Sequence, residues 1–231
     1  MKRNDVLETL DTLSSLYPEA HCELNYNSEL NLTIAVLLSA QCTDAMVNKV
    51  TESLFAEFRT AKDYVRLTIP EIEERIKRLG LYRNKAKHIY ELVRILLEKY
   101  NGEIPRTRES LMELPGVGRK TANVVLATAF DIPTIAVDTH VERLSHRIGL
   151  IPSTAKTPMQ IEERLMKAIP EDRWIFAHHG LIWHGRRMCG AKKPACERCP
   201  LAERLCRYAK TARRQSAREP ISAVPPSACT T

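Results

Sequence analysis

The chain has 231 residues, of which 44% are hydrophobic and 27% charged, a composition typical of a globular protein with a substantial core. A charged N-terminus and the lack of any run of about eighteen apolar residues exclude a signal peptide and a membrane-spanning helix, so we expect a cytoplasmic protein. Eleven Lys and Arg against two Glu between Arg186 and Arg218 give that stretch a net charge of +9. This concentration favours a nucleic acid partner, although a solvated basic tail would have the same composition.

Apolar side chains recur three and four residues apart along most of the chain, which predicts an all-α fold of about ten helices. The clearest stripes are Val6, Leu10, Leu13 and Tyr17; then Val47, Val50, Leu54 and Phe58; then Ile89, Leu92, Val93 and Leu96. Asn101 and Gly102 form a C-cap signal after the third stripe, and Thr68 and Thr157 mark two helix starts. Residues 132–137 are the only extended candidate, and the Ala, Ser, Pro and Arg of 212–231 predict a disordered tail.

Residues 114–121 predict a tight turn between two helices. Pro115 ends the first helix, and Gly116 and Gly118 permit positive φ and a close backbone approach. Helical spacing resumes at Ala122, so the bare N–H groups at this helix start can bind a phosphate without a basic side chain. An ordinary turn between helices is the alternative.

Two residues near this turn have side chains suited to catalysis. Lys120 lies beside Arg119 at the positive end of a helix; both influences disfavour the protonated amine and so favour a nucleophilic lysine. The alternative is a lysine that contacts phosphate as a point charge. Asp138 ends an apolar run and opens a helix, so it is expected to be an N-cap, and the same carboxylate could stabilise positive charge or move protons.

Four of the seven cysteines are close together. Cys189, Cys196, Cys199 and Cys206 are separated by six, two and six residues, which in a reducing compartment indicates a metal site rather than disulfides. The spacing alone leaves zinc and an iron–sulfur cluster both open. Closing the loop 190–195 between two ligands would fix Lys192 and Lys193 for phosphate contact.

Five segments resemble the endonuclease III family and occur in the family's order. The sequence Leu-Pro-Gly-Val-Gly at 114–118 resembles the hairpin of a helix-hairpin-helix motif, and the others are 37–44, 80–82, 137–141 and the four-cysteine cluster. The resemblance implies a 4Fe-4S cluster on the four cysteines. The usual family spacing is six, two, five, and one extra residue would rotate a helical ligand by about 100°, which puts Cys206 in doubt as a ligand.

The resemblance also implies two helical domains with a DNA cleft between them. One would be a six-helix domain, 22–131, that holds the hairpin and Lys120. The other would be discontinuous, 1–21 plus 132–211, and would hold Asp138 and the cluster. A monomer is expected, associated with the nucleoid in a bacterium.

The implied function is that of a bifunctional base-excision glycosylase and abasic-site lyase, which removes oxidised pyrimidines from duplex DNA. In this chemistry Lys120 attacks C1′ of the sugar, the damaged base leaves, and β-elimination follows from the resulting iminium, with Asp138 stabilising charge at C1′. The lesion must first be flipped out of the duplex. The DNA contacts implied or expected are Gln41, Leu81, Gly116, Val117, Gly118, His140, Lys192 and Lys193.

Some of these residues have structural alternatives. Gln41 could be a polar residue at a helix end, Leu81 a core leucine, and His140 a structural histidine. Leu81 follows Gly80, which is expected to cap the preceding helix, so we expect its side chain to be exposed in the turn.

Other functions compete with oxidised-pyrimidine removal. An adenine-mismatch glycosylase usually lacks the nucleophilic lysine, so Lys120 argues against it, whereas a thymine-mismatch glycosylase is harder to separate. A non-catalytic helix-hairpin-helix DNA-binding protein would not need both Lys120 and Asp138. A redox-sensing protein would need the cysteines without the hairpin.

Overall fold

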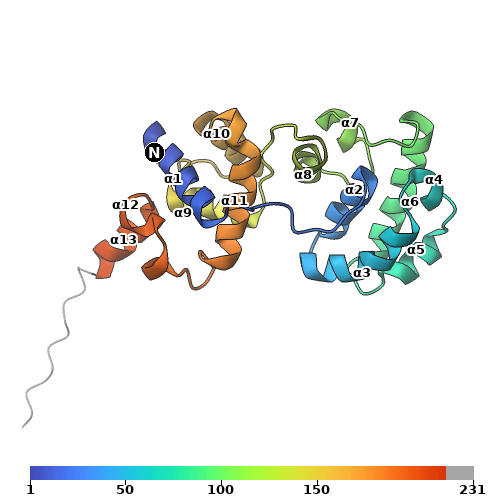
Figure 1. The fold of residues 1–231 in the computed structure, drawn as a ribbon, viewed down its shortest axis with the longest axis horizontal. Helices are drawn as coiled ribbons and strands as arrows, with labels where there is room; N and C mark the ends of the chain where they lie inside the picture. The colour runs from blue at the N-terminus through green and yellow to red at the C-terminus, as the bar shows by residue number, and fades with distance from the viewer. Residues whose placement is uncertain (217–231) are drawn as a thin grey trace, which may run out of the picture.

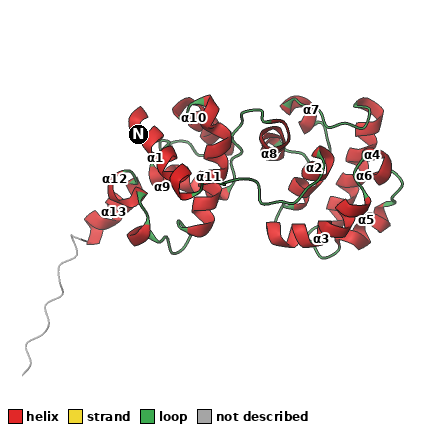
Figure 2. Cartoon of the chain, viewed as in Figure 1, coloured by secondary structure: helices red, strands yellow, loops and turns green. Residues whose placement is uncertain are grey.

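The computed structural model describes residues 1–216, which form helices joined by loops (Figures 1 and 2). This part of the chain contains no β-strand, only an isolated bridge between Cys189 and Pro194, so the predicted all-α class is confirmed. Nor does it contain a helix long and apolar enough to cross a membrane.

Thirteen α-helices make up the described chain, ten of them with eight or more residues. The longer helices are α1 (Arg3–Leu16), α2 (Glu29–Leu38), α3 (Asp44–Glu57), α5 (Ile69–Ile76), α6 (Tyr82–Lys99), α8 (Arg119–Phe130), α9 (Thr139–Ile148), α10 (Pro158–Ala168), α11 (Trp174–Arg187) and α13 (Arg207–Ser216). The single-turn helices are α4 (Ala61–Tyr64), α7 (Arg108–Met112) and α12 (Leu201–Arg204). Two 3-10 turns, η1 (Glu171–Arg173) and η2 (Cys196–Arg198), complete the set. Apolar periodicity indicates long helices such as α1, α3 and α6 but misses the single-turn helices, because one turn is too short to show a period.

Helix boundaries follow the capping residues. Thr157 forms the expected capping box, and Thr68, predicted as a helix start, forms one as well. Gly102 accepts the left-handed conformation just past α6, with its amide bonded to the Leu96 carbonyl (2.8 Å). α13 continues to Ser216, beyond the residue where the tail was expected to begin, because Ala, Arg and Gln are good helix formers. Residues 217–231, the rest of that predicted tail, lie outside the described residues.

Buried hydrophobic side chains form two separate clusters. The helices that carry them lie on the two sides of the ribbon in Figure 1. The first cluster is formed by the helices from α2 through α8, and Leu32, Ile34 and Ile89 are fully buried in it. The second cluster is formed by α1 together with the helices from α9 through α13, and it includes Leu10 and Leu165. The N-terminal helix therefore packs with the C-terminal half of the chain.

A buried carboxylate connects the two clusters. Glu162 of α10 is 2% exposed and accepts two hydrogen bonds from the guanidinium of Arg119, at 2.8 Å from Nε and 2.9 Å from Nη2. Arg119 is the first residue of α8, so this bidentate pair joins the second cluster to the first. Arg108 of α7 lies 3.7 Å from the same carboxylate.

The segment 132–137, expected to be extended, has no strand partner and is held by side chains instead. Asn123 of α8 donates to the Ile135 carbonyl (3.0 Å), and Thr134 donates to the Asn123 carbonyl (2.7 Å). From the other side, His178 Nδ1 of α11 donates to the Ala136 carbonyl (2.9 Å). The segment that leads to Asp138 is therefore tied to a helix of each cluster.

The Arg119–Glu162 pair predicts unequal costs for its two partners. Arg119→Met would leave a buried carboxylate with only Arg108 nearby, and we expect a loss of about 2–4 kcal/mol, below the full range for a buried pair because Arg119 is 38% exposed. Glu162→Gln keeps an acceptor and leaves a guanidinium that can reach water, so about 1–2 kcal/mol is expected. Urea unfolding of both variants measures the two losses of unfolding free energy. A larger loss for Glu162→Gln than for Arg119→Met would contradict the prediction.

Candidate active site and cysteine cluster

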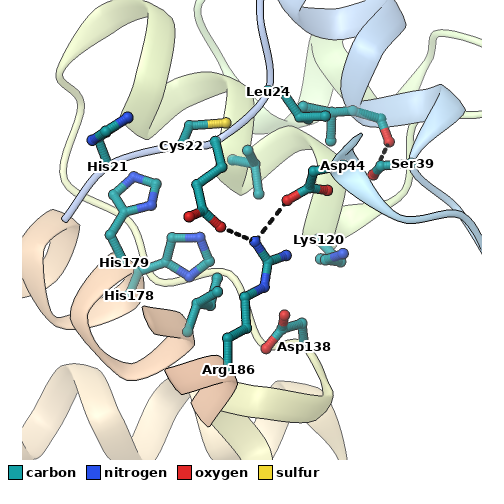
Figure 3. A pocket seen from close by; sticks show the side chains of 14 residues that line it. His21, Cys22, Leu24, Ser39, Asp44, Lys120, Asp138, His178, His179 and Arg186 are labelled. Atoms are coloured by element: carbon teal, nitrogen blue, oxygen red, sulfur yellow. Dashed lines mark hydrogen bonds and ion pairs between the residues drawn. The ribbon is translucent and has the colours of Figure 1, made fainter. Parts of the chain in front are cut away.

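Lys120 and Asp138 line the same pocket (Figure 3). Lys120 comes from the start of α8 in the first cluster, and Asp138 precedes α9 in the second. Ser39, Asp44 and Arg186 also line the pocket. The structure thus brings the two predicted catalytic residues to one cavity at the boundary between the two clusters.

Lys120 is the second residue of α8, and its side chain is exposed. The first amides of a helix have no carbonyl partner within it, so this end of α8 is positive. Arg119 was expected to add positive charge beside Lys120, but its guanidinium turns to Glu162 and its charge is largely compensated. Lys120 therefore keeps its place at the N-terminus of α8, while the neighbouring guanidinium points to Glu162.

The two glycines of the hairpin have different conformations. Gly116 has φ 79°, and a Cβ there would lie 2.8 Å from Leu37 Cδ1 and 2.9 Å from His88 Nδ1, so another residue would strain the backbone and displace these side chains. Gly118 has φ −90° as the extended N-cap of α8, so it does not use the positive φ that a glycine permits. Nothing lies within 4 Å of a Cβ built on Gly118, which leaves that backbone open to a ligand.

Val117 shapes the turn. Its side chain is 5% exposed and belongs to the first hydrophobic cluster, and its amide donates to the Leu114 carbonyl (3.0 Å). The amide of Val117 is therefore used within the hairpin, and the amides that follow it are the ones directed outward.

Asp138 is the N-cap of α9, as predicted. Its Oδ1 accepts hydrogen bonds from the amides of His140 and Val141, both at 2.8 Å. Because both bonds use one oxygen, the cap orients the carboxylate without using its other oxygen. His140 is half-buried, burial lowers its pKa, and its Nδ1 accepts from Arg143 Nη2 (3.2 Å).

Several polar residues of the pocket carry no sequence signal. Arg186 of α11 pairs with Asp44 at 2.8 Å and with Glu23, and these partners come from distant segments (Figure 3). Burial lowers the pKa of His178 to about 4 and that of His179 to about 3, so both rings are neutral at neutral pH. Only the folded chain brings these groups together.

Gln41 and Leu81 lie at the tips of two exposed loops. Their φ angles are 57° and 59°, in the left-handed region that side chains rarely adopt. Leu81 is 55% exposed, so the alternative of a core leucine is wrong. Gly80 is not the left-handed cap that was expected, because α5 already ends at Ile76 and Leu81 takes that conformation itself.

The four clustered cysteines line one small, mostly apolar pocket between α9, α11 and α12. Burial raises the pKa of the Cys199 and Cys206 thiols. His184 Nε2 lies 3.5 Å from the Cys199 sulfur, and its Nδ1 lies 3.1 Å from the Tyr17 hydroxyl. Within residues 1–216, no three His, Cys, Asp or Glu side chains are grouped closely enough to hold a single metal ion.

Cys206 joins the other three despite the extra residue. α12 ends at Arg204, and the Cys206 amide donates back to the Leu201 carbonyl (2.7 Å) before α13 begins. Because Cys206 lies between two helices, the helical rotation expected from the insertion does not apply. The wider turn places its sulfur at the shared pocket.

The loop between Cys189 and Cys196 is held by α9. Arg147 donates to the carbonyls of Gly190 (2.8 Å) and Ala191 (2.6 Å). Lys192 and Lys193 follow these contacts and are both exposed. The loop thus presents two ammonium groups from an anchored backbone.

Residues 34–171 match the sequence profile of the HhH-GPD superfamily of base excision DNA repair proteins. Endonuclease III of Bacillus subtilis (strain 168) is 48% identical over 198 residues, 86% of this chain and 90% of the relative. An endonuclease III trapped as a covalent intermediate with DNA, the estranged-adenine complex, superposes with a TM-score of 0.86 and 49% identity, covering 93% of this chain and all of that one. A thermostable thymine-DNA glycosylase shares the fold, with a TM-score of 0.80 and 24% identity over 90% of this chain and 98% of its own. The chain therefore belongs to the endonuclease III family within the HhH-GPD superfamily of base excision DNA repair proteins.

Proposed function

We propose that this chain removes oxidised pyrimidines from duplex DNA and cleaves the resulting abasic site, with Lys120 as the nucleophile. The observation that carries this proposal is the pocket shared by Lys120 and Asp138, beside a hairpin whose outward amides suit a phosphate. Family membership supports a glycosylase and abasic-site lyase, the activity of endonuclease III.

The proposed reaction uses the two residues in sequence. The neutral Lys120 amine attacks C1′ of the flipped nucleotide, and the damaged base leaves with the electron pair of its glycosidic bond. Asp138 stabilises the positive charge at C1′ and accepts a proton from the amine. Ring opening gives an iminium between Nζ and C1′, and removal of a C2′ proton then expels the 3′ phosphate.

The DNA contacts are assigned by position. The amides after Gly118 bind a backbone phosphate, and Gly116 and Val117 shape the turn that presents them. Gln41 and Leu81 enter the space left by the extruded base, since an apolar wedge replaces lost stacking. Further phosphate contacts come from His140, Lys192 and Lys193.

We assign the two hydrophobic clusters to the predicted domains, 22–131 and 1–21 plus 132–211, although Ala136 of the linking segment packs in the first cluster. DNA would then lie across their boundary, where the pocket of Lys120 and Asp138 opens. A thymine-mismatch activity is the second candidate, but that solved glycosylase shares 24% of its sequence with this chain against 49% for the endonuclease III–DNA intermediate. The difference favours oxidised pyrimidines.

The four-cysteine pocket fits a 4Fe-4S cluster. Cys189, Cys196, Cys199 and Cys206 all line one apolar cavity, and a cluster of this kind is held by four thiolates. Arg147 Nη1 lies 3.5 Å from the Cys189 sulfur, so a cationic side chain stands beside the four-cysteine pocket. When bound, the cluster would cross-link α11 to the segment after α12 and so hold Lys192 and Lys193 in place.

Lys120→Ala should abolish covalent trapping. With borohydride and a duplex that carries thymine glycol, the wild-type protein should give a reduced enzyme–DNA adduct, because reduction fixes the iminium. The variant should give none, while the exposed control Lys156→Ala should trap normally. Trapping and strand cleavage by Lys120→Ala at the wild-type rate would show that another group is the nucleophile.

Asp138→Asn should separate capping from catalysis. Asn is as good an N-cap as Asp, so thermal unfolding should change little, while single-turnover base removal should slow on the order of 100-fold or more. Asp138→Ala, which also loses the cap, should cost about a further 1 kcal/mol of stability. Equal rates for wild type and Asp138→Asn would leave the residue with a capping role only.

Protein purified without oxygen should contain about four iron and four sulfide ions per chain, as a 4Fe-4S cluster requires. Cys206→Ala should lower the iron content and the unfolding temperature, because its sulfur lines the same pocket as the other three. Cys42→Ala, outside that pocket, is the matched control for iron content. Stoichiometric zinc without sulfide, or full iron in Cys206→Ala, would count against the assignment.

A further inference from the structure

Lys85 is a buried lysine that the proposed chemistry does not use. It is 4% exposed, and a lysine is almost never buried unless its ammonium is paired. Its Nζ donates to the Leu38 carbonyl (2.9 Å) and the Ala40 carbonyl (2.7 Å), and lies 3.3 Å from Cys42 Sγ. An ammonium has three N–H donors, so these three acceptors satisfy it.

The three acceptors surround the Gln41 loop. Leu38 is the last residue of α2, whose terminal carbonyls form the negative end of that helix, and Ala40 and Cys42 flank Gln41 on both sides. The Cys42 amide donates to the Ser39 carbonyl (3.0 Å), which closes the turn. One buried charge therefore holds a loop whose tip has an unfavourable φ of 57°.

The backbone of Lys85 fixes the second loop. Its amide donates to the Leu81 carbonyl (3.1 Å), the bond that starts α6 directly after the left-handed Leu81. The two loops are also neighbours, since a Cβ on Gly80 would lie 4.0 Å from the Gln41 carbonyl oxygen. The side chain of Lys85 thus holds one projecting tip while its main chain holds the other.

We propose that Lys85 is a positioning residue for base extrusion, which locks the Gln41 and Leu81 tips into one rigid unit before DNA binds. This role rests on the proposed function, because it requires both tips to enter the duplex. Tips that are already ordered lose less conformational freedom on binding, so more of their contact energy is available to displace the base. Lys85 itself is buried and does not touch DNA.

Lys85→Met tests this proposal, since methionine is unbranched and removes all three donors. The matched control is Lys87→Met on the same helix, where the exposed ammonium pairs with Glu91 at 3.7 Å. Two substrates are compared in single turnover: a duplex with thymine glycol opposite adenine, and a single strand with an abasic site, which needs no extrusion. We expect Lys85→Met to slow the duplex reaction roughly 10- to 100-fold and the single-strand reaction by about threefold at most. Lys87→Met should change neither.

A double-mutant cycle separates this role from general loss of structure. Gln41→Ala and Leu81→Ala should each slow the duplex reaction in the wild-type background but should have little further effect in Lys85→Met. Hydrogen exchange should also quicken at residues 39–43 in Lys85→Met and not in Lys87→Met. If Lys85→Met does not fold, Lys85→Gln, which keeps one donor group, takes its place in every arm.

The outcomes distinguish a failure of the Lys85 role from a failure of the DNA role of the Gln41 and Leu81 tips. Suppose that Gln41→Ala and Leu81→Ala slow only the duplex reaction. Lys85 then has no positioning role if Lys85→Met slows the reactions of both substrates equally, or if its effect on the duplex reaction is fully additive with the effects of the two tip variants. If Gln41→Ala and Leu81→Ala do not distinguish the substrates, the assigned DNA role of both tips fails, and the role of Lys85 with it. Selective slowing of the duplex reaction, non-additivity and faster exchange together support the proposal.

Discussion

The hydrogen bonds between Glu162 and Arg119 cross the boundary between two hydrophobic clusters, and the geometry of the pocket depends on that boundary. Lys120 follows Arg119 directly, so the pair fixes the start of α8 against α10. Asn123, one turn further along α8, holds the segment that ends at Asp138. A few polar contacts thus set the distance between two side chains that belong to different cores. Hydrophobic burial stabilises each core but is non-directional, so it cannot set this spacing.

Residues that shape the backbone also supply the proposed chemistry. The Asp138 carboxylate caps α9 through one oxygen, and the same contact orients it in the pocket with Lys120. Gly116 lets the hairpin pack on Leu37 and His88, while Gly118 leaves open space beside the first amides of α8. Left-handed conformations at Gln41 and Leu81 place unfavourable backbone geometry at the two tips proposed to enter DNA. Local structure and function therefore use the same atoms.

The cysteine cluster shows how an insertion can be absorbed. A residue added within a helix would rotate the next ligand by about 100°, but a residue added between two helices only widens a turn. Here the Cys206 amide bonds to the Leu201 carbonyl, and the sulfur still faces the pocket of the other three cysteines. Arg143 and Arg147 of α9 then anchor the loop that carries Lys192 and Lys193. The second core and the proposed DNA surface are joined at this point.

The sequence by itself determined the all-α class, the longer helices, the hairpin turn, and the residue types of the candidate site. Periodicity, capping and glycine spacing are local properties, and the family motifs are contiguous, so both can be read along the chain. The pairing of Arg119 with Glu162, of Arg186 with Asp44 and Glu23, and of Lys85 with the Gln41 loop was decided only by the tertiary structure. The helix cap expected at Gly80 was also wrong, because Leu81 takes the left-handed conformation there, and Gly118 is extended because it is the N-cap of α8. Charges and carbonyls from distant segments find partners only after helix packing removes them from water, and a local pattern carries no information about which partner that will be.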